Sequence, residues 1–135
     1  MKSMTNAPYG HTKSLGKTDF DAAVTRVTEA LKTEGFGVLT EIDVKATLKK
    51  KLDADFRNYK ILGACNPPLA HNALTNELLI GLLLPCNVVV FDEDDGTTTV
   101  SIANPKELFK IVDKPGMEEL ADEVDSKLKR ALAAI

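Results

Sequence analysis

The chain has 135 residues, of which 44% are hydrophobic and 27% charged, and its formal net charge at pH 7 is −3. This length predicts a single domain, residues 1–135, and the composition excludes an intrinsically disordered chain. The small negative charge gives no field that would attract a nucleic acid or an anionic membrane, so neither is expected as a partner. The first ten residues lack the apolar segment of a secretory signal, which predicts a cytoplasmic protein whose two cysteines are reduced.

The first half of the chain predicts two strands and two helices. In chain order these are a strand at a sheet edge over Tyr9–Leu15, a helix over Asp19–Thr33, a strand over Phe36–Ile42, and a short helix from a cap at Asp43 to Leu52. Thr18 and Asp21 form a variant of the capping box before the first helix, and a left-handed residue is expected just after it, where Gly35 stands. The second helix carries several lysines, which we interpret as a solvated face rather than an anion site.

The second half predicts three strands and three helical segments. In chain order these are a central strand over Tyr59–Ala64, a helix over Pro68–Asn76, strands over Cys86–Phe91 and Thr97–Ile102, a helical turn from Asn104 to Val112, and a final amphipathic helix over Met117–Leu132. Asn66 can cap the Pro68–Asn76 helix. The run Leu78–Phe91 is too short and interrupted to span a membrane, so it is expected to lie in the core. These elements together predict an α+β fold.

Three sequence stretches carry a resemblance to a known family: GFGVLTEID at 35–43, LGACNPPLAH at 62–71 and LLPCNV at 83–88. In these stretches the chain resembles the bacterial and archaeal domain-of-unknown-function family 302. The resemblance implies a β-α-β-β-β-β-α antiparallel sheet with helices packed on one face, like the TATA-binding-protein fold, and a homodimer. It implies no established activity. The signature positions of the family fall on Glu41, Asp43, Cys65, Asn66, Pro67, His71, Pro85 and Cys86.

The homodimer has a second, independent argument in the sequence. The segment Leu78–Leu84 contains five leucines and one isoleucine among seven residues. A monomer of this size would have difficulty hiding that much apolar surface, so we expect part of it to be covered by a second copy.

Cys65, His71 and Cys86 are the candidate site residues. Cys65 leaves one strand, His71 lies one turn into the next helix and Cys86 enters another strand, so the three can meet at one end of the sheet. Two thiols and an imidazole would supply three ligands of a tetrahedral soft-metal site, with water, substrate or Glu41 as the fourth. Asn66 and Cys86, with Glu41, are the residues expected to contact a bound small molecule.

Three other interpretations stay open. Cys65 stands just before a helix N-terminus, where a thiolate is favoured, and could act as a nucleophile assisted by His71. The protein could instead bind a small molecule without using its thiols, or be a purely structural dimeric partner whose cysteines only pack in the core. Whether the protein uses a cofactor, and which one, is unknown from the sequence.

Several common site types are excluded by their spacing. The acidic run Asp92–Asp95 does not place ligands as a calcium loop requires and is explained by a hairpin turn before Gly96. The sequence contains no glycine-rich phosphate loop and no GxSxG nucleophile motif. An ordinary hydrolase or nucleotide enzyme is therefore not expected.

Overall fold

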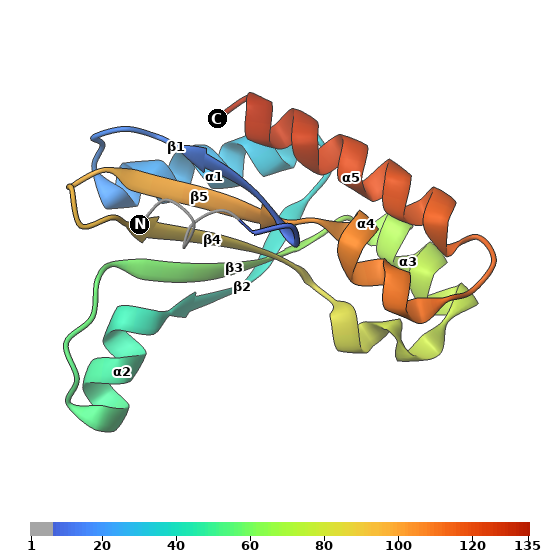
Figure 1. The fold of residues 1–135 in the computed structure, drawn as a ribbon, viewed down its shortest axis with the longest axis horizontal. Coiled ribbons are helices and arrows are strands. Elements are labelled where there is room, and N and C mark those ends of the chain that lie inside the picture. The colour runs from blue at the N-terminus through green and yellow to red at the C-terminus, as the bar shows by residue number, and fades with distance from the viewer. Residues whose placement is uncertain (1–6) are drawn as a thin grey trace.

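In the computed structural model, which describes residues 7–135, five strands form one antiparallel sheet in the order β1-β5-β4-β3-β2 (Figure 1). The strands are β1 (Gly10–Ser14), β2 (Gly37–Asp43), β3 (Tyr59–Cys65), β4 (Cys86–Asp92) and β5 (Thr98–Ala103). The helices are α1 (Phe20–Thr33), α2 (Val44–Leu52), α3 (Pro67–Asn76), α4 (Pro105–Leu108) and α5 (Met117–Ala133), with 3₁₀ segments η2 (Leu78–Leu83) and η3 (Phe109–Val112). The α+β fold with a five-stranded antiparallel sheet is confirmed.

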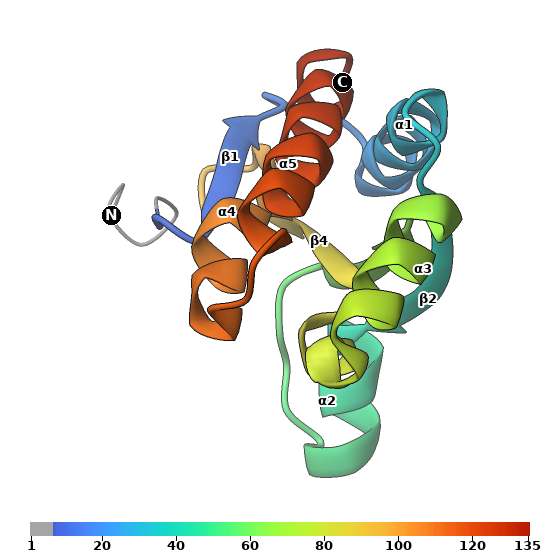
Figure 2. The ribbon, with the colours of Figure 1, turned by 90° about the vertical axis from the view of Figure 1, so that its right-hand side faces the viewer.

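The core lies between the sheet and helices α1 and α5, which pack against each other over one face (Figure 2). Alternate residues of the central strands point into it, because successive side chains of a strand lie on opposite faces. Val88 and Val90 of β4 and Leu62 of β3 are completely buried there. On the opposite face the rings of Tyr59 and Phe91 stack with their centroids 5.4 Å apart.

The N-cap of α1 differs from the sequence prediction. Asp19, not Thr18, caps the helix, and its carboxylate accepts a hydrogen bond from the backbone N–H of Ala22 at 3.0 Å. The reason is that Phe20 is the first helical residue, so the extended residue directly before it takes the capping position. After the helix, Gly35 has a φ of +82°, which confirms the expected left-handed residue.

The segment 78–83 also departs from expectation, because it is not wholly core. It forms the 3₁₀ helix η2, in which residues three apart lie on the same side. Ile80 is buried and Leu83 half-buried, whereas Leu78, Leu79 and Leu82 are 78%, 70% and 85% exposed. Only one side of η2 therefore belongs to the core.

Helix α2 stands away from the rest of the protein at the β2–β3 edge of the sheet (Figures 1 and 2). None of its residues is buried, and its four lysines are exposed. Lys49 forms ion pairs with Asp53 at 2.9 Å and Asp55 at 3.3 Å. The helix makes its main contacts with β2 and β3.

The edge strand β1 is fastened to α5 by polar contacts. His11 Nε2 lies 2.6 Å from Oδ1 of the buried Asp125, whose other oxygen is 3.2 Å from Lys129 Nζ. Lys13 Nζ donates hydrogen bonds to the backbone oxygens of Leu132 and Ile135.

Within residues 7–135, no helix has the length and apolar character needed to cross a membrane.

Candidate functional site

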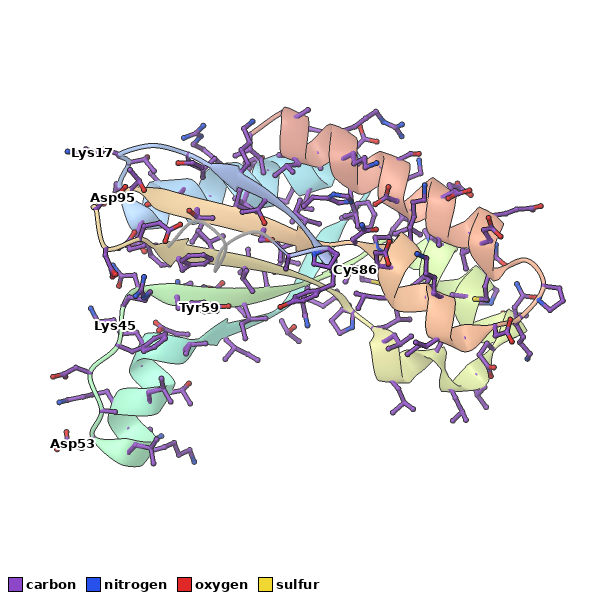
Figure 3. All side chains as sticks on the ribbon, in the orientation of Figure 1. Lys17, Lys45, Asp53, Tyr59, Cys86 and Asp95 are labelled. Atoms are coloured by element: carbon purple, nitrogen blue, oxygen red, sulfur yellow. The ribbon has the colours of Figure 1, made fainter. Side chains whose placement is uncertain are left out.

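A cavity of about 320 Å³ lies at the end of the sheet where β3 runs into α3 and β4 begins. Figure 3 shows Cys86 at this end, next to the helical part of the molecule. The floor of the cavity comes from β3 and β4, one wall from α3, and the other walls from α5 and the residues before β4. The lining residues come from five stretches of the chain, at 36–40, 64–74, 84–86, 109 and 120–124.

The cavity exists because most residues of α3 and of the ends of β3 and β4 that line it have small side chains. The small lining residues are Ala64, Cys65, Ala70, Ala73 and Cys86. Larger apolar residues close its inner side, among them Phe36, Phe109 and Val124. Protein interiors are normally packed with few voids larger than a water molecule, so a space of this size between well-formed elements is a binding-site candidate.

The mouth of the cavity lies between β2 and the second half of α3. Most lining residues are buried or half-buried, but Leu39, Thr40 and Leu74 are exposed. Leu39 sits at a register shift in the pairing of β2 with β3. Gly63 permits the close approach of neighbouring segments here, because a side chain at that position would collide with Thr40 and Pro85.

Both cysteines line this cavity, as expected for residues at adjoining strand ends. The antiparallel register places Ala64 opposite Cys86, so Cys65 follows one residue beyond the pair. Burial, with a smaller contribution from Cys65, raises the pKa of the Cys86 thiol to about 11. Cys86 is therefore a protonated thiol at neutral pH, while Cys65 is only half-buried and both cysteines are free.

The side chain of Asn66 holds the cavity wall in place. Its Oδ1 accepts a hydrogen bond from the Leu69 N–H, which caps α3, and its Nδ2 donates to the Glu34 backbone oxygen at 3.2 Å. The residue thereby ties the start of α3 to the end of α1. This contact with Glu34 uses one of the two amide hydrogens of Asn66.

His71 and Glu41, the other two predicted site residues, lie outside the cavity lining. His71 is exposed on α3. Glu41 forms an ion pair with Lys60 at 2.6 Å, and this hydrogen bond raises the pKa of Lys60. Among residues 7–135, no three His, Cys, Asp or Glu side chains are grouped so that they could hold a metal ion. The structure thus brings together Cys65, Asn66 and Cys86, but not the predicted trio with His71.

Comparison with known proteins identifies the family. The sequence model described as "Domain of unknown function DUF302" matches residues 11–135. The chain belongs to the DUF302 family. A solved structure of an uncharacterized conserved DUF302 protein from Bacillus stearothermophilus is 34% identical in sequence, with a TM-score of 0.86 over 95% of this chain and 98% of that chain. No curated protein matches the sequence.

All three stretches that resemble the DUF302 family meet at the cavity. Stretch 35–43 supplies Phe36, Leu39 and Thr40, stretch 62–71 supplies the end of β3 and the start of α3, and stretch 83–88 supplies the segment that enters β4. Ala70 and Ala73 were not among the predicted site residues. Their spacing of three on α3, with Leu69 and Leu74 beside them, was the available signal that this helix turns a face of partly small side chains inward.

Proposed function

We propose that this DUF302 protein binds a small, uncharged, mostly apolar molecule in the cavity at the end of the sheet. The observation that supports this most directly is the lining, which contains no charged side chain. A volume of about 320 Å³ is at the lower end of the range of small-molecule sites. Burying a charged ligand there would require paired counter-charges that the lining does not offer.

The few polar groups of the cavity suggest how such a ligand is oriented. The Thr40 hydroxyl stands at the exposed mouth, and the Cys65 thiol and the Asn66 side-chain amide lie where β3 meets α3. A ligand with one carbonyl or hydroxyl group could hydrogen-bond there and place its apolar part deeper, against Phe36 and Val124. The Cys86 thiol contributes as an apolar surface because it stays protonated.

A thiol-dependent enzyme using Cys65 is the second candidate function. Cys65 lines the cavity at the start of α3, so a bound molecule would lie beside its sulfur. His71 is not a lining residue, so this version rests on Cys65 without the predicted base. The rate of iodoacetamide alkylation at Cys65 distinguishes the enzyme from the binding protein. A reactive nucleophile would be alkylated faster than the free amino acid cysteine in solution, and a cysteine that only lines a binding cavity would not.

We also propose that the protein is a cytoplasmic homodimer without a nucleic-acid or membrane partner. The exposed leucines of η2 favour a second copy of the chain as partner, because a monomer would leave them in water. A purely structural dimer would share this surface but would not need the cavity. The ligand experiment therefore separates a binding module from a structural partner protein.

The test uses N-phenyl-1-naphthylamine, a neutral dye whose fluorescence rises in apolar sites. We expect the wild-type protein to bind it saturably at one site per chain. Ala70→Phe, which fills the cavity from a half-buried lining position, should weaken binding at least about tenfold. His71→Phe adds an aromatic ring at the next residue, outside the lining, and should leave binding unchanged. Equal effects of the two variants, or no saturable binding by wild type, would refute the proposal.

A further inference from the structure

The exposed apolar surface of the protein is concentrated in two segments. Ten large apolar side chains are exposed among the described residues, and eight of them lie within residues 39–56 and 74–82. The eight are Leu39, Ile42, Leu52, Phe56, Leu74, Leu78, Leu79 and Leu82. Isolated exposed apolar residues are normal on a protein surface, but a cluster of this kind indicates an interaction surface.

Each of these two segments reaches the cavity mouth at one end only, and α2 lies at the far end of β2 from the mouth (Figure 3). The first contains β2 and α2 and the second contains the end of α3 and η2, and Figure 1 shows α2 and η2 projecting from the same side of the molecule. Leu39 from the first segment and Leu74 from the second line the cavity itself. At these two residues the exposed apolar surface is therefore continuous with the apolar interior of the proposed binding site.

The size of this surface fits a protein partner of standard dimensions. The eight side chains expose roughly 500 Å² of apolar area if one fully exposed side chain counts as roughly 100 Å². A standard interface buries about 800 Å² on each partner, of which somewhat more than half is apolar. The apolar area needed for one such interface is thus present on the two segments together.

We propose that a second copy of this chain covers the cavity mouth, with the 74–82 segment of each copy packed against the 39–56 segment of the other. This inference rests on the proposed ligand-binding function of the cavity. Each segment exposes apolar side chains, so a two-fold axis can pack the apolar side chains of one segment against those of the partner's other segment. The exposed lysines of α2 would lie at the rim of this contact, in water. The one charged residue of the 74–82 segment, Glu77, is already paired with Lys114 at 3.6 Å, so no unpaired charge would be buried there.

Covering the mouth makes ligand binding and dimerisation depend on each other. A ligand in the cavity would contact Leu39 and Leu74 on its own chain and the partner's segment above them. The closed site removes more of the ligand from water than the open one, so the dimer binds it more tightly. By thermodynamic reciprocity the ligand must then strengthen the dimer by the same factor.

The test combines sedimentation velocity with binding of N-phenyl-1-naphthylamine. The double variant Leu78→Asp/Leu79→Asp places charges on the proposed seam without touching the cavity lining. Ile111→Asp is the matched control, because Ile111 is 76% exposed but lies outside both segments. We expect wild type and the control to be dimers, the double variant to be a folded monomer by circular dichroism, and its affinity for the dye to fall about tenfold.

Each other result overturns the inference. A monomeric wild type, or a double variant that stays dimeric, would show that these segments are not the seam. A monomeric variant with unchanged dye affinity would show that the seam does not cover the mouth. Dye binding that remains sensitive to Ala70→Phe in those cases would leave the proposed function intact. A monomer that binds anionic vesicles through Leu78 and Leu79 would assign the surface to a membrane instead.

Discussion

Strands β3 and β4 are tightly packed in the middle of the sheet, but at its end they line a cavity. At one level of β3 and β4, Leu62 is paired with Val88, and both are completely buried against the helices. Two residues further along, on the same face, Ala64 is paired with Cys86, and the space beside them is the cavity. The apolar pattern is continuous, and only the size of the side chains changes.

This difference shows that hydrophobicity and volume carry separate information. An apolar pattern directs a strand face inward wherever it occurs, because burying apolar surface is favourable regardless of shape. Filling that interior needs large side chains, and the chain places Ala70 and Ala73 of α3 where such side chains would be needed. The end of the sheet therefore contains an apolar space that the protein's own side chains do not fill.

The largest expected effect comes from truncating the filled region. Leu62→Ala should destabilise the protein by about 3–5 kcal/mol, because Leu62 is completely buried and its removal leaves a new cavity. Ala64→Val adds volume on the same strand and faces the existing cavity, so it should cost less than about 1 kcal/mol. Guanidinium-chloride unfolding measures both. Similar costs for the two variants would contradict the difference between the two regions.

Alkaline pH should destabilise the end of the sheet through Cys86. Its thiol has a pKa of about 11 in the folded protein, compared with 9.0 for an unperturbed cysteine. Because the folded state holds the proton more tightly, this contribution is fully present below pH 9 and is lost as the pH rises to about 11. The loss amounts to roughly 2–3 kcal/mol.

Measuring the free energy of unfolding from pH 8 to 11 tests this contribution. In Cys86→Ala the component assigned to the thiol should disappear, while other groups that titrate in this range, such as Lys60, keep their effects. Cys65→Ala is the matched control, since Cys65 is half-buried in the same cavity. A pH dependence that is unchanged in Cys86→Ala would show that the thiol is not held in an apolar environment.

The smallest stability effect is expected at the cap of α1. Asp19→Ala should cost about 1 kcal/mol, because its carboxylate accepts the Ala22 N–H, whereas Thr18→Ala should be close to neutral. Thermal unfolding of the two variants makes the comparison. The opposite order would restore Thr18 as the cap, and it would leave the account of the sheet's two regions unchanged.

The arrangement of the strands could be predicted because local rules agreed with the final fold. Val88 and Val90 alternate with less buried neighbours in β4, and the turn before Gly96, whose φ is +84°, returns the chain into β5. The same reasoning brought Cys65 and Cys86 to one end of the sheet. Antiparallel neighbours place the end of one strand beside the start of the next, whatever the rest of the fold does.

His71 and Glu41 lie outside the cavity lining for different physical reasons. On α3, the helical period that turns Ala70 and Ala73 inward turns His71 outward, so its position followed from information already in the sequence. Glu41 is different, because an irregularity at Leu39 shifts the register of β2. The shift puts Glu41 opposite Leu62, on the helix-covered face, where it meets Lys60. A one-residue irregularity in a strand has no sequence signal of its own.

The central claim is that the cavity at the end of the sheet is the binding site. The most direct measurement is a titration of isotope-labelled protein with N-phenyl-1-naphthylamine, followed by the backbone amide signals in two-dimensional NMR. The account predicts that the signals of Ala64, Ala70 and Cys86 shift most, because these residues line the cavity. Shifts that are largest at Tyr59 and Phe91, which stack on the opposite face of the sheet, or no shifts at all, would contradict it.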